Sequence, residues 1–336
     1  MKRSGAILWA FLTIFILAQS PVSTAAALEK IRFPYSPISL ESLPWWVAKD
    51  AKSFEKYGLD VEMTYEGASS AIIQDMLSGQ ANLAGVAGPA VIGNVLKGGD
   101  VIQVAAVIKT FDIPMYAAPS IKELADLTGK KVGVSRFGAI SHFEAVLLLQ
   151  RAGVKDVTII QTGGIPESMA ALSSGAVAAA MVTPPQSVLL REKGFRELVG
   201  VQQLRAMNIP FVGNGVAARR GYGEKNPEIV KSFIKGAFEG IKRIFEDKEF
   251  SMTTLAKYTK ITDPKLLEES YRFAVDVFEK DGRVPPESQQ SLVEQLIGLK
   301  LIDADAAKKT PTTAYYDNRY ADELEKEGFF KSLWQH

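Results

Sequence analysis

The sequence predicts an α/β protein of two lobes, each a mainly parallel sheet flanked by helices, with two hinge crossovers and a helical C-terminal extension. Strand and helix patterns alternate along the first part of the chain, the same order returns downstream, and helical patterns fill the remainder. The 336 residues are 47% hydrophobic and 23% charged, which suits one large or two medium domains rather than a disordered chain.

The first lobe begins with alternating strands and helices. Alternating apolar positions predict a strand over Lys30–Tyr35, and apolar residues at helical spacing predict a helix over Trp45–Tyr57 that stops at Gly58. The next strand, helix and buried strand are expected over Leu59–Tyr65, Ser69–Leu77 and Ala81–Ala87. Such a βαβαβ succession predicts parallel strands covered on both faces.

The second lobe repeats this order. Strands are expected over Lys131–Ser135, Val157–Gln161 and Val177–Val182, and helices over His142–Arg151 and Pro166–Leu172. A shift of 96 positions places Gly67–Pro89 on Gly163–Pro185 with six identities, from either shared architecture or a true repeat. Two lobes with this wiring leave a cleft at the carboxyl ends of their strands.

Two segments are expected to cross between the lobes, Lys109–Ala118 and Phe211–Ala217. The resulting boundaries assign residues 28–112 plus 213–336 to lobe 1 and residues 113–212 to lobe 2. Two crossovers permit hinge closure, because only a few residues need to change φ and ψ.

Helices are expected to fill the tail of lobe 1. Asn226 and Pro227 are a good N-cap and first-turn pair for an amphipathic helix. Asp263-Pro264 and Pro285-Pro286 punctuate two further helices, and charged residues beyond Tyr315 indicate a solvated last helix.

The N-terminus predicts a secretory signal peptide over residues 1–27. Lys2 and Arg3 precede an apolar run from Ala6 to Ala18, and small residues then accumulate up to Ala27. The run has 13 residues, fewer than the roughly 18 needed to span a bilayer, and no second stretch could span one. Because no cysteine follows to carry a lipid, we expect a protein that diffuses freely in the periplasm. We also expect it to be a monomer.

Composition and motifs argue against several classes of function. Lys+Arg 39 against Asp+Glu 38 leaves no basic excess for nucleic acid, and zero cysteines with two histidines exclude thiolate and multi-histidine metal sites. Residues 129–131 do not form a phosphate loop, residues 213–218 match a dinucleotide pattern only loosely, and residues 67–71 are no nucleophile elbow. We therefore expect no catalytic residue, no metal and no cofactor, and a small molecule as ligand.

Three junctions between a strand and a helix are the best binding signals, at Glu66–Ser70, Ser135–Ser141 and Thr162–Ser168. Each places free backbone N–H groups of a helix N-terminus at the end of a strand, where they attract anionic oxygens. The alternative is that Ser69, Ser141 and Ser168 only cap their own helices.

Four further side chains are candidates for the cleft. Arg136 is either a partner for a carboxylate, sulfonate or phosphate or an ordinary solvated arginine. His142 suits the cleft wall or a helix cap better than catalysis, because no catalytic partner is in sight. One of Trp45 and Trp46 is expected in the core and the other at the cleft, and Thr183 is placed to face the cleft.

Five segments carry a resemblance to a known family, namely Ala48–Val61, Leu77–Leu83, Ile121–Val134, Gly138–His142 and Met169–Ala180. They resemble the sulfonate/nitrate/taurine-binding and thiamine-pyrimidine-precursor-like family of ABC-importer binding proteins, which have the type II periplasmic binding fold. The resemblance spans roughly Ile31 to Val216. It implies ligand contacts from the loop after the first strand, the Gly67–Ser70 turn, the strand end near Ala87-Gly88, and the Gly138–His142 helix start.

Two departures from the family narrow the range of possible ligands and activities. Many relatives resembling this chain carry an acidic residue where Thr183 stands, which puts a cationic or amine-bearing ligand in doubt. The pyrimidine-synthesising enzymes of the family depend on a cysteine-rich segment, which this chain lacks.

The resemblance implies the periplasmic solute-binding component of an ABC importer, which captures a small anionic organic solute and delivers it to a permease and ATPase complex. An enzyme on the same fold, or a receptor for a membrane signalling protein, remains an alternative. The candidate ligand-binding residues are Ser36, Trp45, Gly67, Ser69, Ser70, Ala87, Gly88, Arg136, Gly138, Ser141, His142 and Thr183.

Overall fold

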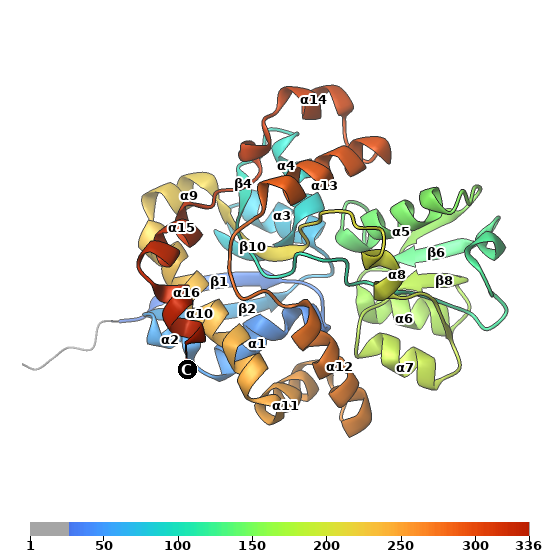
Figure 1. Cartoon of the computed structure of the whole chain (residues 1–336), viewed down its shortest axis with the longest axis horizontal. Coiled ribbons are helices and arrows are strands. Elements are labelled where there is room, and N and C mark those ends of the chain that lie inside the picture. The colour runs from blue at the N-terminus through green and yellow to red at the C-terminus, as the bar shows by residue number, and fades with distance from the viewer. Residues whose placement is uncertain (1–26, 336) are drawn as a thin grey trace, which may run out of the picture.

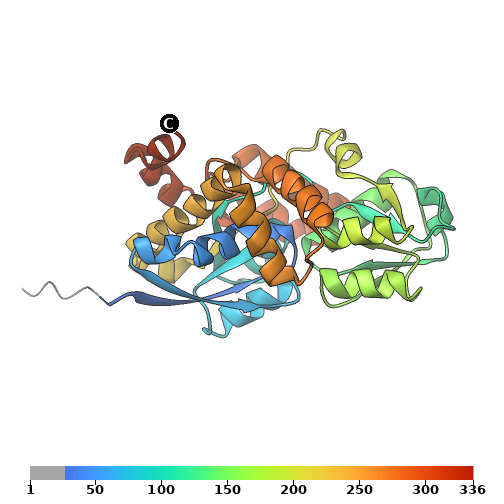
Figure 2. The ribbon, with the colours of Figure 1, turned by 90° about the horizontal axis from the view of Figure 1, so that it is seen from below.

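The computed structural model describes residues 27–335, so the predicted signal peptide lies outside the described residues except for its last position. Two α/β lobes lie side by side, with long C-terminal helices packed over the first (Figure 1). Helices cover both faces of each sheet (Figure 2), and the strands at residues 83–87, 101–106, 115–117 and 179–181 are buried along their whole length.

Lobe 1 contains five strands, which form a two-stranded and a three-stranded sheet. Strand β1 (Glu29–Tyr35) pairs in parallel with β2 (Leu59–Tyr65) and packs beside β3 (Leu83–Ala87). The returning strand β10 (Asn214–Arg219) lies antiparallel between β3 and β4 (Val101–Ala106). Helices α3 (Ser69–Leu77) and α4 (Gly88–Val95) connect these strands.

Lobe 2 has the strand order β7-β6-β8-β5-β9. The strands are β5 (Met115–Ala117), β6 (Lys131–Val134), β7 (Thr158–Gln161), β8 (Ala179–Met181) and β9 (Arg196–Val199). The helices are α5 (Ile140–Arg151), α6 (Ile165–Ser173), α7 (Gln186–Glu192) and α8 (Val201–Arg205), with the 3₁₀ turn η2 (Leu124–Leu127) before β6.

The predicted two-lobed α/β class is confirmed, and its strand pairing is mixed: β1 with β2, and β6 with β7 and β8, pair in parallel, whereas β10 and β5 pair antiparallel with both of their neighbours. These strands, β10 and β5, are the ones that follow a crossover from the other lobe, so they enter the sheet from the opposite end. They also occupy parts of the expected crossovers, and the chain passes between the sheets over residues 107–114 and 206–213. The lobe boundaries at 112/113 and 212/213 stay a prediction.

The predicted helix over Trp45–Tyr57 is wrong in one respect, because it is broken in two. Helix α1 (Leu43–Asp50) ends before Lys52, which adopts a left-handed φ of 58°, and α2 (Ser53–Lys56) follows. The break turns the second segment so that Phe54 packs against Phe233 of the C-terminal helices. Tertiary packing thus overrides a helical periodicity that is continuous in sequence.

The C-terminal extension is helical as expected. Its helices are α9 (Arg220–Lys225), α10 (Pro227–Glu246), α11 (Lys248–Thr259), α12 (Pro264–Val277), α13 (Pro286–Gly298), α14 (Ala304–Lys309), α15 (Arg319–Lys326) and α16 (Phe329–Trp334), with the 3₁₀ turn η3 (Thr312–Ala314) before α15. Helix α10 packs its apolar face on α1. Within residues 27–335, no helix combines the length and apolar character required to cross a bilayer.

The extension also reaches the second lobe. Arg191 of α7 forms an ion pair with Glu269 of α12, and Lys265 Nζ lies 2.8 Å from Glu192 Oε1. Gln150 of α5 donates to the carbonyl of Gly298 at the end of α13 (3.2 Å). Helices α12 and α13 therefore contact lobe 2 on two sides of the cleft.

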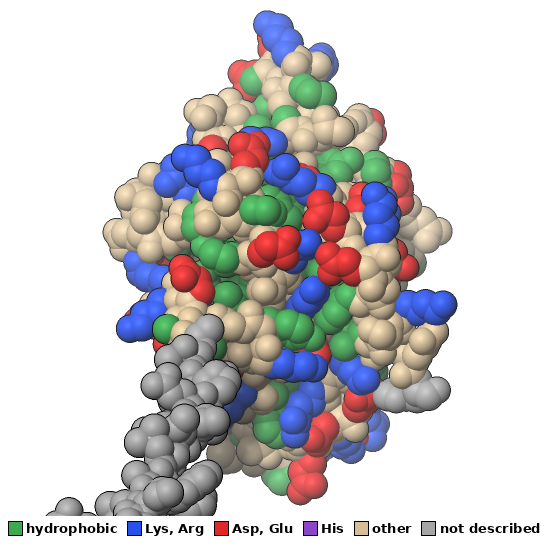
Figure 3. Space-filling model, turned by 90° about the vertical axis from the view of Figure 1, so that its left-hand side faces the viewer, with side chains coloured by type: hydrophobic (Ala, Val, Ile, Leu, Met, Phe, Trp, Pro, Cys, Tyr) green, Lys and Arg blue, Asp and Glu red, His purple; other side chains and the backbone are tan. Residues whose placement is uncertain are grey.

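Charged side chains of both signs are interspersed on the outer face of lobe 1 (Figure 3), in keeping with a formal net charge of +1. No single-sign patch dominates this face.

Close packing of α10 on α1 leads to a stability prediction. A Cβ on Gly240 would lie 2.6 Å from the carbonyl oxygen of Pro44 and 2.8 Å from the Cβ of Ala48. Because backbone atoms cannot easily yield, we expect Gly240→Ala to destabilise the fold by about 1–3 kcal/mol. Thermal unfolding measures this, with Gly298→Ala as control because a Cβ there meets nothing within 4 Å. An unchanged melting temperature for Gly240→Ala would contradict the packing.

Candidate ligand-binding cleft

The two lobes touch through the loop after β1. This loop contains the 3₁₀ turn η1 (Leu40–Ser42), where the amide of Leu40 donates to the carbonyl of Pro184 in lobe 2 (3.0 Å). Gln186 Nε2 donates to the carbonyl of Ile38 (2.7 Å), and Thr183 Oγ1 donates to Glu41 Oε2 (3.0 Å). One side of the cleft is therefore closed by hydrogen bonds between the lobes.

Two glycines form a second contact between the lobes. Gly67 follows β2 and Gly163 follows β7, at equivalent positions under the 96-residue shift. A Cβ on Gly67 would lie 2.2 Å from the carbonyl oxygen of Gly163, and one on Gly164 would lie 2.5 Å from the Tyr65 hydroxyl. Only glycine allows the lobes to come this close.

A small space, here called the inner chamber, lies between the carboxyl ends of the two sheets. Its volume is about 20 Å³. Its walls are Ser36, Pro37, Glu41, Ala68, Ser69, Ala87, Asp112, Ile113, Ser135, Ala139, Ile140, Ser141, Ile165 and Asn214. Both lobes and the first crossover contribute, so the chamber exists only when the lobes are together.

The three serines at the helix starts do not cap their own helices, which rules out the simpler of the two expectations for them. The N-cap residues of α3, α5 and α6 are Ala68, Ala139 and Gly164, none with a side-chain cap. Instead Ser69 Oγ accepts from the amide of Ala87 (3.1 Å), Ser141 Oγ accepts from the amide of Ser135 (3.0 Å), and the Ser168 and Thr162 hydroxyls lie 2.6 Å apart. The serines thus tie each helix start to a neighbouring strand end, and the first two line the inner chamber.

Three carboxyl groups are buried in this region: Glu41 and Asp112 line the chamber, and Glu144 contacts Ile113 of its wall. Glu41, Asp112 and Glu144 are 2%, 1% and 0% exposed. Glu41 accepts from Ser39 and Thr183, and Glu144 Oε2 accepts from the amide of Ile113 (3.3 Å). Burial raises the pKa of Glu41 to about 7, and burial followed by the neighbouring carboxyls raises the pKa of Asp112 and of Glu144 well above the ordinary range.

The sequence signal for these acids was weak but present. Asp112 stands between Phe111 and Ile113 in a crossover, and Glu144 interrupts an otherwise apolar helix face. A charged residue within an apolar run is a candidate for burial at a site. Glu41 carries no such signal, and only the contact with Thr183 reveals its place.

The structure places the carboxyl group of Glu41 beside Thr183. The sequence has no acid at Thr183, which counted against a cationic ligand. In the folded chain Glu41 of η1 reaches Thr183 from the other lobe and supplies a carboxyl group there.

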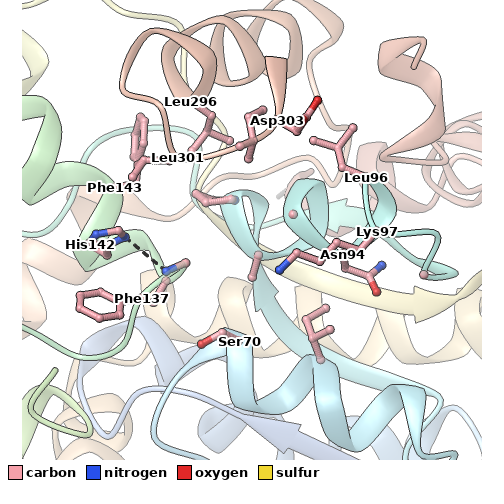
Figure 4. Close-up of a pocket in the computed structure, with 18 of the residues that line it drawn as sticks. Ser70, Asn94, Leu96, Lys97, Phe137, His142, Phe143, Leu296, Leu301 and Asp303 are labelled. Atoms are coloured by element: carbon pink, nitrogen blue, oxygen red, sulfur yellow. Dashed lines mark hydrogen bonds between the residues drawn. The ribbon is translucent and has the colours of Figure 1, made fainter. Parts of the chain in front are cut away.

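A larger space, here called the outer cavity, opens beside the chamber and has a volume of about 750 Å³. Its walls come from α3, α4 and the start of α5, and from the α13–α14 connection (Figure 4). The lining residues include Ser70, Leu77, Gly93, Asn94, Lys97, Phe137, Gly138, Ala139, His142, Phe143, Leu296, Lys300, Leu301 and Asp303. This volume suits a small organic ligand.

His142 stands at the wall of the outer cavity. Its Nδ1 accepts from the amide of Gly138 (3.3 Å), and its ring lies 5.1 Å from that of Phe137 (Figure 4). Partial burial lowers its pKa, so the ring is neutral at pH 7. A neutral ring with an occupied Nδ1 offers a ligand its Nε2–H as a donor.

The structure distributes the twelve candidate residues over different places. Ser36, Ser69, Ala87 and Ser141 line the inner chamber, and Ser70, Gly138 and His142 line the outer cavity. Gly67 forms the contact between lobes, Thr183 bonds to Glu41, and Arg136 is exposed beside Gly67.

Two candidates belong to the packing instead of the cleft. Trp45 is fully buried against Phe33 of β1, and Trp46 is equally buried and stacks on Tyr258, so the expectation that one of them lines the cleft is corrected. Gly88 is buried where a Cβ would lie 2.9 Å from the carbonyl of Val212. Neither Trp45 nor Gly88 lines the chamber or the cavity.

The described part of the chain has no cluster of metal-binding side chains. Among residues 27–335, no group of three or more His, Asp or Glu side chains is arranged to hold an ion.

Comparisons with known proteins agree with this architecture. The family model described as NMT1/THI5 like matches residues 40–250. None of the curated proteins matches the chain.

Solved structures share the fold at low sequence identity. The alkanesulfonate-binding protein SsuA from Xanthomonas axonopodis pv. citri, bound to MOPS, has a TM-score of 0.74 at 17% identity, covering 88% of this chain and 100% of its own. The periplasmic nitrate-binding protein NrtA from Synechocystis PCC 6803 has a TM-score of 0.74 at 14% identity, covering 89% of each chain. A Candida albicans protein described as having the generic periplasmic binding protein fold has a TM-score of 0.68 at 15% identity, covering 87% and 97%. The chain has the periplasmic binding protein fold.

Proposed function

The chain belongs to the NMT1/THI5-like family, and from this premise we propose that it is the periplasmic solute-binding component of an ABC importer. It captures a small organic solute with an anionic group between its lobes and presents the closed form to a membrane permease and its ATPase. The protein holds the solute without changing it and acts as a monomer.

The outer cavity is the observation that carries this proposal. At about 750 Å³ it is large enough for a small organic molecule, and residues of both lobes line it. A solute bound there favours the closed arrangement, because only that arrangement gives it contacts from both sides.

An anionic group suits the mouth of this cavity. The first turns of α3 and α5 border it at Ser70 and Ala139, and helix N-termini favour negative charge. Lys97 and Lys300 stand on its rim. The structural relatives named as sulfonate- and nitrate-binding proteins are consistent with such a ligand.

Filling the outer cavity tests this function directly. Gly93 of α4 lines the cavity, and a Cβ there meets nothing within 4 Å. We expect Gly93→Phe to leave the fold intact and to weaken solute binding by at least about thirtyfold, because the ring would occupy the ligand's space. A thermal-shift screen over sulfonates, carboxylates and aromatic acids selects the solute, and calorimetric titration measures its affinity.

Gly221→Phe is the matched control, because Gly221 in α9 is also open and lies outside the cavity. Full affinity of the Gly93→Phe variant for the selected solute would overturn the proposed location. Turnover of the solute by the purified protein would favour an enzyme instead.

A further inference from the structure

Helix α12 lies between the two lobes, beside α11 of lobe 1 and α7 of lobe 2 (Figure 1). We propose that this helix is an electrostatic clasp, which holds lobe 2 against lobe 1 through a row of ion pairs and closes part of the protein before any solute binds. For its effect on solute affinity the inference rests on the proposed function, but closure itself can be measured without a solute.

One face of α12 is fixed to lobe 1. Leu267, Ala274 and Val277 are buried in the apolar core to which α1 and α10 also contribute. Their spacing places these three side chains on one side of a helix. The Tyr271 hydroxyl also donates to the carbonyl of Ile244 in α10 (2.9 Å). Helix α12 is therefore part of lobe 1 and moves with it.

The other face of α12 carries charges that match those of α7 in lobe 2. Glu269 forms an ion pair with Arg191, and Lys265 Nζ lies 2.8 Å from Oε1 of the neighbouring Glu192. Each helix thus contributes one positive and one negative charge. A shift of one helix along the other would bring like charges together, so the two pairs select a single closed arrangement.

A third ion pair connects the last turn of α12 with the first crossover. Asp276 pairs with Arg205 of α8, and Arg205 Nε donates to the carbonyl of Phe111 in that crossover (3.4 Å). Asp276 follows Glu269 by seven positions, and Glu269 follows Lys265 by four, so the three side chains share one side of the helix. The three ion pairs therefore form a row along α12 that faces lobe 2.

Salt reaches these ion pairs. The side chains of Lys265 and Asp276 are 66% and 55% exposed, and that of Arg191 is 48% exposed. An exposed ion pair shifts an equilibrium by roughly 1.5- to 5-fold, and salt screens it. Three such pairs favour the closed arrangement by roughly 3- to 100-fold at low ionic strength. Because a solute held by both lobes needs the closed form, the clasp also raises its apparent affinity.

The clasp can be tested on the solute-free protein, which has no cysteine of its own. Glu249→Cys in α11 and Ser173→Cys in α6, both at exposed positions, carry a donor and an acceptor dye. We expect single-molecule energy transfer to show at least about 10% closed molecules at roughly 10 mM sodium chloride. The ratio of closed to open molecules should fall at least about threefold at roughly 500 mM. A wholly open protein at low salt, or a ratio that salt does not change, would overturn the clasp.

Charge reversal distinguishes the clasp from general packing. Glu269→Arg faces Arg191 with a like charge and should lower the closed-to-open ratio at low salt by at least about fivefold, and adding Arg191→Glu should restore it. Glu268→Arg is the matched control, because Glu268 pairs with Lys248 and Arg272 within lobe 1 and the change in net charge is the same. No recovery in the double variant, or equal opening by Glu268→Arg, would count against the clasp. The salt series needs none of these reversals, so it remains decisive if one of them does not fold.

Titration with pentane-1-sulfonate separates this inference from the proposed function. We expect Glu269→Arg to weaken binding of this probe by the factor by which it reduces the closed share. Salt-dependent binding with a salt-independent closed share would overturn the clasp and leave the anionic solute standing. Salt-dependent closure, with no solute bound in the thermal-shift screen, would support the clasp and count against the proposed function.

Discussion

Gly67→Ala is expected to hold the two lobes apart and to weaken solute binding by roughly 5- to 150-fold. The added methyl group would lie 2.2 Å from the Gly163 carbonyl oxygen, a backbone atom that cannot rotate away. Overpacking of this kind costs about 1–3 kcal/mol, and here the cost falls only on the closed state. Since binding is coupled to closure, the whole penalty appears in the affinity.

Small-angle scattering and calorimetric titration measure this effect. The radius of gyration of wild-type protein should fall when the selected solute is added, and that of Gly67→Ala should fall less at the same concentration. Gly221→Ala controls for the loss of a glycine, because a Cβ there meets nothing within 4 Å. If Gly67→Ala closes and binds like wild type, the contact between Gly67 and Gly163 is not part of closure.

The free energy of unfolding in the absence of solute is expected to fall as the pH rises from about 5 to 8. Burial raises the pKa of Glu41 from 4.5 to about 7, so the folded state holds a proton that the unfolded state has already lost. The stability from this group is complete below the unfolded pKa and disappears as the pH passes the folded pKa. The loss is about 3 kcal/mol for Glu41, and Asp112 and Glu144 act in the same direction.

Urea unfolding at pH 5 and pH 8 measures this loss for the wild type and for Glu41→Gln. The variant has no proton to lose at this position, so its stability should fall less over the same interval. His142 acts in the opposite direction, because its pKa is lowered, and the comparison between wild type and variant cancels its contribution. Asp305→Asn is the control for an exposed carboxyl. Identical pH profiles of the wild type and Glu41→Gln would contradict the raised pKa.

Local patterns predicted most of the framework of the two lobes. Helix α3 was predicted at Ser69–Leu77 and has those bounds, and α6 lies at the positions that the 96-residue shift requires. These elements are determined by apolar periodicity and by glycines at their ends, which act over a few residues. The strands β5 and β10 were harder to predict from the sequence, because their partner strands lie in distant parts of the chain.

The site was only partly predictable, for a related reason. The helix starts at Ser69, Ser141 and His142 could be located because a strand followed by a helix places its junction at the edge of a sheet. Trp45 could not be assigned to core or cleft, because both environments accept an aromatic ring. Its burial depends on α10, which begins almost two hundred residues further along the sequence.

By itself, the sequence determined the two-lobed α/β class, the family and the helix starts at the cleft, because each depends on local periodicity or on short motifs. Only the tertiary structure decided that Glu41 and Asp112 line one chamber with Glu144 buried beside it, that Gly67 touches Gly163, and that the α13–α14 connection closes the outer cavity. These features join segments that are far apart in the chain. Their burial and their charge interactions come into existence only when both lobes and the C-terminal helices pack together.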